Sequence, residues 1–507
     1  MKLIRSNRLN DKEMFTGDLA PVTARSSGRW FALMVLCLGA LMIVLDTTIV
    51  NVALPSIRQD LGFSETSLAW VVNAYLLTFG GFLLLGGRLG DLFGHRRLFL
   101  IGITLFTLAS FACGMARAQA FLVTARAIQG IGGAVVSAVA LSLIMTLFTK
   151  PAERAKAMGF FGFVAAGGGS IGVLLGGILT NVLNWHWVFL VNLPVGVAVV
   201  VLSLVLLPSG RGPATTARLD IAGAITVTAS LLLAVYAIVN GNQVGWTSGQ
   251  TIGLLAVSAA LLALFLVIEA RVRAPLMPLS LFRLRNVAIA NVIGVLWTAA
   301  MFAWFFLSAL YLQLVLGYRP LEVGLAFLPA NMIMAVFSLG LSARLVTRFG
   351  IRLPIVVGLL LAASGLALFA RAPVGGSFAT DVLPGMTLLG FGAGMAFNPV
   401  LLAALNDVAP EDSGLASGVV NTSFMMGGAL GLAILASLAT ARTNGLLTTG
   451  LNHLAALNGG YQVAFLVAAL FALSASLLGA ALLRFKASDT PIQDESRNEQ
   501  RVPEVCA

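Results

Sequence analysis

Charged residues are scarce in this chain of 507 residues, of which 10% are charged and 59% hydrophobic. A soluble domain carries charge on about a quarter of its residues, because charged groups cover its water-facing surface. The composition therefore excludes an ordinary soluble protein and predicts an all-α polytopic membrane protein. The first thirty residues are polar and basic and lack a short apolar core, so we expect no cleavable signal peptide.

Cysteine and histidine are also rare, with three residues of each type. Cys37, Cys113 and Cys506 show neither metal-ligand spacing nor a disulfide framework. A membrane-embedded enzyme would need a nucleophile beside a base, a histidine cluster or a set of metal ligands, and the sequence has none of these patterns. We therefore expect no catalytic residues, no metal and no cofactor. A sensor protein is also disfavoured, because no loop or tail is long enough for a soluble domain.

Long apolar runs are abundant. Fourteen of them are long enough to cross about 30 Å of hydrocarbon, and they begin near residues 30, 68, 98, 120, 156, 187, 220, 251, 287, 321, 353, 380, 413 and 461. We expect Pro55 to end the first run. Of the 31 Lys and Arg residues, 25 fall on the side of the two chain ends, five fall on the other side, and Arg126 lies within a span. Basic loops stay in the cytoplasm, so both termini are predicted to be cytoplasmic.

The net charge of +11 is explained by this uneven distribution of basic residues. No basic patch interleaved with aromatic residues remains to indicate a nucleic-acid surface. The expected environment is the lipid bilayer of a cell's inner (plasma) membrane, crossed many times by the chain.

Two opposite charges lie deep within the apolar runs, Asp46 in "ALMIVLDTTIVNVALPSI" and Arg126 in the fourth span. At 1.5 Å per residue, Asp46 lies about 13 Å and Arg126 about 9 Å below the same surface. A charge at that depth costs a few kcal/mol, so we expect the two side chains to share a polar cavity. Burial disfavours a charged carboxyl group and a guanidinium favours it. The pair is therefore either a fixed ion pair or a site of proton exchange.

Two motifs accompany these charges. The loop after the second span reads "GGRLGDLFGHRRL", and the fourth span contains "RAIQGIGGA". In the loop, we expect Gly87 to allow close helix approach and Gly94 to permit a tight turn. Asp91 is expected to cap or face a helix N-terminus. Arg96 and Arg97 are expected to lie at the inner face. The residues assigned to this gating loop are Gly87, Asp91, Gly94, Arg96 and Arg97.

The loop resembles the signature loop of the major facilitator superfamily, and the fourth-span motif resembles that superfamily's buried-arginine motif. Four further stretches are similar to the fourteen-span drug:proton antiporters, a branch of multidrug efflux proteins, and the resemblance extends from Trp30 to about Leu483. These stretches are "LDTTIVNVALPSI", "WVVNAYLL", "NWHWVFLVNLPVG" and "GLASGVVNTSFMMGGALGLAI".

The resemblance implies two six-helix bundles that rock about a central substrate site, with two extra helices inserted between them. The implied division of the chain is a cytoplasmic arm at 1–29, a first bundle at 30–208, inserted helices at 209–286, a second bundle at 287–484 and a cytoplasmic tail at 485–507. The resemblance also implies a monomer that is driven by the proton gradient.

The fifth span is rich in glycine and reads "GFVAAGGGSIGVLLGG". Its glycines recur every four residues, so one helix face allows close packing. Antiporters of the superfamily generally have a proline where this chain has Val173. These glycines either allow the two bundles to rock against each other or serve only to pack neighbouring helices closely. They are Gly168, Gly172, Gly176 and Gly177.

Aromatic residues with a few polar neighbours suit a bulky apolar or cationic ligand. We expect the substrate cavity to be lined by Asn73, Tyr75, Gln129, Trp297, Phe302, Trp304, Phe305 and Tyr311. The predicted function is proton-coupled export of hydrophobic drugs or secondary metabolites. A proton-coupled importer, or an exporter of one specific metabolite, is the alternative because it would share the fold and the coupling charges.

Overall fold

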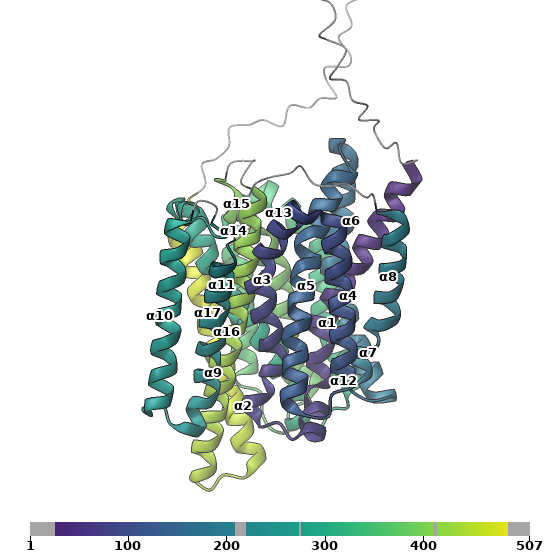
Figure 1. The fold of residues 1–507 in the computed structure, drawn as a ribbon. Coiled ribbons are helices and arrows are strands. Elements are labelled where there is room, and N and C mark those ends of the chain that lie inside the picture. Colours follow the sequence, from purple (N-terminus) through teal and green to yellow (C-terminus); the bar gives the residue numbers. More distant parts are fainter. Residues whose placement is uncertain (1–25, 208–219, 273–274, 409–412, 485–507) are drawn as a thin grey trace, which may run out of the picture.

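The structure is a computed structural model, and it describes residues 26–207, 220–272, 275–408 and 413–484. Most of the predicted N-terminal arm and the whole predicted C-terminal tail lie outside these ranges. In the described part the regular structure is helical, as the composition predicts. The long helices run roughly parallel, with α1 beginning and α17 ending at the upper end of Figure 1.

The elements follow one another with short connections. The first half contains α1 (Ser26–Leu61), α2 (Glu65–Leu68), α3 (Trp70–Phe93), α4 (His95–Gly114), α5 (Gln119–Leu147), α6 (Pro151–Val182), α7 (Trp187–Leu190) and α8 (Asn192–Leu206). Next come α9 (Ile221–Val244), α10 (Gly249–Arg271) and the 3₁₀ turn η1 (Leu279–Arg283).

The second half contains α11 (Arg285–Leu310), η2 (Tyr311–Val315), α12 (Pro320–Val336), η3 (Phe337–Leu341), α13 (Ser342–Phe349), α14 (Arg352–Phe369), η4 (Phe378–Val382), α15 (Leu383–Leu405), α16 (Ser413–Thr448) and α17 (His453–Leu482). The short elements η2, η3 and η4 are π-helical.

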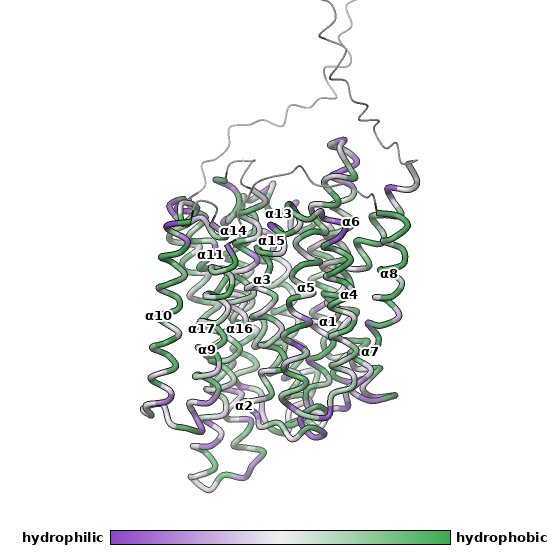
Figure 2. The backbone as a smooth tube through the Cα atoms, viewed as in Figure 1, coloured by the Kyte–Doolittle hydropathy of each residue, from purple (hydrophilic) through white to green (hydrophobic). Residues whose placement is uncertain are grey.

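Twelve helices of the described chain are long and apolar enough to cross a membrane. Figure 2 shows the hydrophobic middle of the bundle and the hydrophilic residues gathered at its two ends. This distribution places the middle in hydrocarbon and the ends in water. The protein is therefore a multi-pass membrane protein. The predicted count of fourteen spans is not established by this criterion, because α6 and α12 contribute only shorter apolar stretches to it.

The prediction that Pro55 ends the first span is wrong, because α1 continues through Pro55 to Leu61. A proline inside a helix removes one backbone hydrogen bond. Here the helix also carries Val52, Leu54 and Ile57, which are fully buried on either side of the proline. Their packing stabilises the helix across the missing hydrogen bond.

Two sets of helices pack together internally. In the first half α3 and α4 pack on α5, and α1 packs on α6; in the second half α14 packs on α15 and α17, and α11 packs on α16. The two halves meet mainly where α3 lies against α16 and α6 lies against α12. Each of these two contacts therefore joins one helix of the first half to one helix of the second half.

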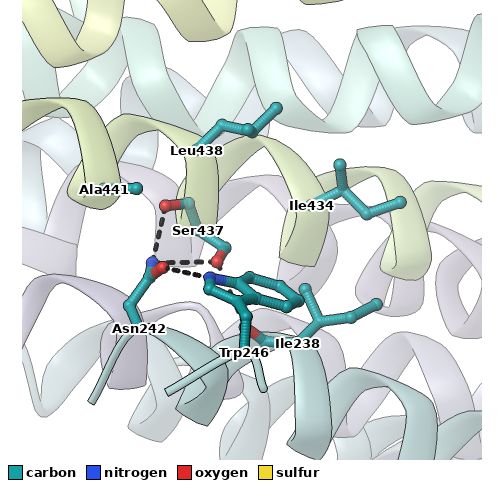
Figure 3. Close-up of a pocket in the computed structure, with 7 residues that line it drawn as sticks. All are labelled: Ile238, Asn242, Trp246, Ile434, Ser437, Leu438 and Ala441. Carbon is teal, nitrogen blue, oxygen red and sulfur yellow. Dashed lines mark hydrogen bonds between the residues drawn. The ribbon is translucent and has the colours of Figure 1, made fainter. Parts of the chain in front are cut away.

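The inserted helices α9 and α10 lie at one edge of the molecule in Figure 1, and α9 contacts both α3 and α16. Near the lower end, Asn242 of α9 donates to the backbone oxygen of Ser437 (2.7 Å) and to its hydroxyl (2.9 Å). The Trp246 indole donates to Asn242 Oδ1 at 2.9 Å. Figure 3 shows these residues beside a small crevice between α9 and α16, the helix that carries Ser437. The inserted pair is thus attached to both halves of the protein.

Candidate functional site

Asp46 and Arg126 meet in the interior of the first half. Asp46 lies on α1 and Arg126 on α5, and Arg126 Nη1 lies 2.5 Å from Asp46 Oδ2. Both residues have 0% exposure. The sequence prediction placed these two charges at similar depth, and the structure brings them into direct contact.

Neutral donors surround the carboxylate. Asp46 Oδ1 accepts from Gln129 Nε2 at 2.8 Å and from Asn192 Nδ2 at 3.2 Å. Ser110 accepts from the same two amides, at 3.0 Å and 2.9 Å, and donates to the backbone oxygen of Phe189. Helices α1, α4, α5 and α8 therefore each contribute a side chain to one hydrogen-bonded network.

The guanidinium is held as firmly as the carboxylate. Arg126 Nε donates to the Val71 backbone oxygen at 2.9 Å, and Nη1 also donates to Gln129 Oε1 at 2.7 Å. The Tyr75 ring centre lies 4.4 Å from the guanidinium carbon, a distance at which the face of the ring attracts a cation. Arg126 Nη2 has no hydrogen-bond partner among the described residues.

This geometry defines what the site can do. A buried ion pair is stabilised only when its other polar atoms are also hydrogen-bonded, and most atoms of this pair are. A proton added to Asp46 would remove its attraction to Arg126 and leave a buried cation without its counter-charge. The contacts are thus compatible with both predicted roles, a fixed ion pair and a site of proton exchange. In this structure the site is closed to solvent.

Two residues predicted to line the substrate cavity contact this ion pair. Gln129 hydrogen-bonds both members of the ion pair, and Tyr75 stacks on Arg126. Sequence reasoning missed Ser110 and Asn192. Asn192 lies in the quoted stretch "NWHWVFLVNLPVG", where a buried amide in an apolar run was the available signal.

Of the two gating-loop glycines, Gly94 has its predicted role and Gly87 does not. Gly94 has φ of 93°, a conformation that favours glycine, so it does form the turn between α3 and α4. The prediction for Gly87 is wrong, because a Cβ there would lie 3.9 Å from its nearest neighbour. Its neighbour Gly86 allows the close approach, since a Cβ at that position would lie 3.0 Å from the backbone of Val135.

The charged residues of the loop make contacts within the first half. Asp91 Oδ1 lies 3.2 Å from His95 Nε2, and Arg96 Nη2 donates to the Leu204 backbone oxygen of α8 at 2.5 Å. Arg97 is exposed. Among the described residues, no salt bridge joins this loop to the second half.

The glycines of α6 lie against two helices. A Cβ at Gly172 would fall 2.1 Å from Thr48 Oγ1, and one at Gly176 would fall 2.5 Å from the backbone oxygen of Ile49, both on α1. Gly168 packs against Leu41 and Val44 in the same way. Gly177 instead faces α12, where a Cβ would lie 2.7 Å from the Pro320 backbone oxygen. Gly168, Gly172 and Gly176 therefore pack α6 on α1 within the first half, whereas Gly177 contributes to the contact between the halves.

The other residues predicted to line the substrate cavity are buried or half-buried. Trp297, Trp304 and Tyr311 are buried in the second half, and the Tyr311 hydroxyl donates to the backbone oxygen of Pro373. Phe302 and Phe305 are half-buried; Phe305 stacks on Phe327 of α12 with ring centres 5.5 Å apart. Asn73 is fully buried on α3, and neither of its amide atoms has a partner among the described residues.

Known proteins share this architecture and sequence. The Major Facilitator Superfamily model matches residues 36–432. The puromycin resistance protein pur8 of Streptomyces alboniger is 40% identical over 456 residues, covering 90% of each chain. The cephamycin export protein CmcT of Amycolatopsis lactamdurans is 37% identical over 474 residues, covering 92% of this chain and 96% of that protein.

Among solved structures, the inward open conformation of the xylose transporter XylE from E. coli aligns with a TM-score of 0.61 at 16% identity. The alignment covers 91% of this chain and 98% of the transporter, and at this identity it shows a shared fold alone. The family match and the two relatives show similarity in sequence as well as in fold. The chain therefore belongs to the major facilitator superfamily, a family of membrane transporters and not of enzymes.

Proposed function

We propose that this protein exports hydrophobic drugs or secondary metabolites in exchange for protons. The relatives described above are a resistance protein for one antibiotic and an export protein for another, and each is similar over about nine tenths of the chain. Export removes a toxic compound from the cell that makes or meets it. The transported molecule is accordingly a small hydrophobic or cationic compound.

The observation that carries the proton coupling is the Asp46–Arg126 pair. Asp46 accepts hydrogen bonds from three side chains and has 0% exposure, so its charge is stabilised by specific contacts and not by water. A movement that separates α1 from α5 or α8 would lengthen those contacts and favour proton uptake. The driving force in this proposal is the proton gradient, with Asp46 as the proton carrier and Arg126 as its modulator.

Substrate binds, in this proposal, where the two halves meet. Asn73 precedes Gly80 by about two helical turns, so both lie on the α3 face that packs against α16. Unpartnered buried polar atoms also occur on α11, α12 and α16, at Trp304, Ser308, Asn331 and Thr422. A buried polar atom left unpaired costs roughly 1–3 kcal/mol, so a substrate that supplies partners there gains affinity.

Alternating access requires that one end open while the other is closed. At the lower end Gln313 of η2 donates to the Val52 backbone oxygen of α1 at 2.9 Å, and α6 lies against the start of α12. The lower end is thus held by contacts between the halves. We infer that Asp91, Arg96 and Arg97 form the matching latch at the upper end when the protein changes state.

We also propose fourteen spans, arranged as two six-helix bundles with α9 and α10 between them. Helices α6 and α12 supply the two spans beyond the twelve that meet the length and apolarity criterion. An even number returns the chain to the side where it began, and α1 begins and α17 ends at the same end of Figure 1. The excess of basic residues at that end supports a cytoplasmic location for it in this proposal.

A resistance panel tests the function. Cells that express the protein are grown with antibiotics of several classes beside non-expressing cells, and the panel is repeated with Asp46→Asn. The expected result is resistance to at least one hydrophobic compound, lost in the variant. Equal sensitivity of expressing and non-expressing cells to every compound would contradict export.

Everted membrane vesicles distinguish export from import. An imposed gradient with an acidic interior is expected to drive uptake of a fluorescent hydrophobic cation, and addition of substrate is expected to dissipate the gradient. Uptake that instead requires an alkaline interior would favour the importer.

A further inference from the structure

Two acidic residues lie together at the upper ends of the inserted helices. Asp220 immediately precedes α9, and its Oδ1 accepts from the Gly223 backbone N–H at 2.7 Å. Glu269 lies in the last turn of α10, and its Oε2 accepts from the Met277 backbone N–H at 3.0 Å. The two residues are 4% and 3% exposed. One oxygen of each carboxyl group is therefore satisfied by the backbone.

The remaining oxygens of the two groups converge on Gly223. The position that a Cβ of this residue would occupy is 2.5 Å from Asp220 Oδ2 and 2.9 Å from Glu269 Oε1. Both of these oxygens are buried, and neither has a hydrogen-bond partner among the described residues. The absence of a side chain at Gly223 leaves room for both oxygens beside its Cα.

Among the described residues, neither acid has an ion-pair partner. Leu85 of α3, Ala224 of α9 and Leu276 form a buried apolar cluster in this corner. Arg271 is exposed at the end of α10. Two carboxylates that share a buried site do not both ionise at neutral pH. Something must supply a positive charge or a hydrogen between them.

A proton suits this site better than a metal ion. Calcium takes six or more oxygen ligands and magnesium needs six in an octahedron, whereas the described residues provide two free oxygens here. A single proton converts one oxygen into a donor and lets it bond to the other, which satisfies both atoms at once.

We propose that Asp220 and Glu269 share one proton, which makes this pair a second protonation site separate from Asp46. The shared proton joins the start of α9 to the end of α10, and through Met277 to the segment that leads into the second half. When the pH rises, the proton passes to water and leaves two repelling carboxylates. The joint is therefore tightest at low pH and loosens at high pH.

Infrared spectroscopy of the purified full-length protein tests this proposal without any transport assay. The Asp46→Asn variant serves as the background, so that the main proton site does not contribute. We expect a protonated-carboxyl band at neutral pH that disappears in alkaline solution. Asp220→Asn and Glu269→Gln should each remove it, because the introduced amide N–H can donate to the remaining carboxylate.

Glu322→Gln is the matched control, because Glu322 is an exposed carboxyl group that caps α12. It should leave the band unchanged. A spectrum without the band at neutral pH would overturn the proposal, as would a band that survives both Asp220→Asn and Glu269→Gln. Because the measurement reports protonation alone, a failed export assay and a missing band are distinguishable results.

Thermal unfolding provides the second measurement. The midpoint of the protein with an intact pair should fall as the pH rises, because the shared proton is lost, whereas that of Glu269→Gln should change less over the same range. Asp220→Asn should behave like Glu269→Gln. Identical pH dependence in all three proteins would contradict a shared proton.

Discussion

The two halves of the protein differ in how they use charge. Among the described residues, the buried charged ones are Asp46 and Arg126 in the first half and Asp220 and Glu269 at the inserted helices, and all four precede α11. In α11 to α17 the buried polar side chains that the structure describes are neutral. The second half has instead a series of buried aromatic residues on α11 and several polar atoms without partners.

This difference suggests a division of labour on one architecture. The first half holds its charges in a network whose atoms are mostly paired, which suits a group that must change protonation only when helices move. The second half offers apolar surface with isolated donors, which suits a ligand that brings its own acceptors. In the proposed function, proton and substrate bind in different places and are coupled through the contacts between the halves.

The largest effect is expected from Asp46→Asn. The amide keeps the size of the side chain but cannot exchange a proton, so proton-driven export should fall to the level of cells without the protein. Resistance and substrate flux in everted vesicles measure the loss. Asp60→Asn is the control, because Asp60 lies on the same helix but is 55% exposed near the lower end. Full proton-driven export by Asp46→Asn would assign the coupling to another group.

Removal of the guanidinium should destabilise the first half. Arg126→Gln leaves Asp46 as a buried charge without its partner, and breaking such a pair costs roughly 3–5 kcal/mol in the free energy of unfolding. The double variant with Asp46→Asn should recover part of that stability but no export. Denaturation in detergent gives the comparison, and a double variant no more stable than Arg126→Gln would refute the paired arrangement.

A smaller loss is expected where α6 crosses α1. Gly172→Ala places a Cβ 2.1 Å from Thr48 Oγ1, so the helices must separate, at a cost of about 1–3 kcal/mol. Gly169→Ala is a matched control, because its Cβ would lie 3.8 Å from its nearest neighbour. Thermal midpoints of the two variants should differ, with Gly172→Ala the lower. Equal midpoints would show that this crossing tolerates a wider separation.

The smallest effect concerns the hydrogen bond that closes the lower end. Gln313→Ala removes the contact with Val52 and should weaken the closed state by about 0.5–1.5 kcal/mol. Gln462→Ala removes a comparable bond to Ala372 within the second half and should leave closure unchanged. The measurement is labelling of Asn51→Cys, in a background without native cysteines, by a thiol reagent that cannot cross membranes. Faster labelling only with Gln313→Ala is expected, and equal rates would argue against a latch.

Part of this arrangement could be predicted from sequence. Counting residues along two apolar runs placed Asp46 and Arg126 at one depth, because helix rise is constant and charges are rare in hydrocarbon. The faces of the helices were not predictable in the same way. Gln129 and Tyr75 therefore turned out to support the ion pair, and Gly86 rather than Gly87 allows the close helix approach.

The pairing of Asp220 with Glu269 could not be predicted either. Both residues stand at helix ends, where acids are usually solvated, and a whole helical hairpin separates them in the chain. Ser110 and Asn192 are neutral residues of a kind that is common in membrane helices. Only packing in three dimensions shows that Asn192 bonds Asp46 and that Ser110 bonds Asn192.

The most direct test of the account measures protons released when substrate binds. Purified protein in weakly buffered detergent solution is mixed with a transported compound while a pH-sensitive dye is followed. If Asp46 carries the exchanged proton, the wild-type protein releases protons and Asp46→Asn releases none, although it still binds the compound. Equal release from both proteins would contradict the assignment of proton exchange to Asp46.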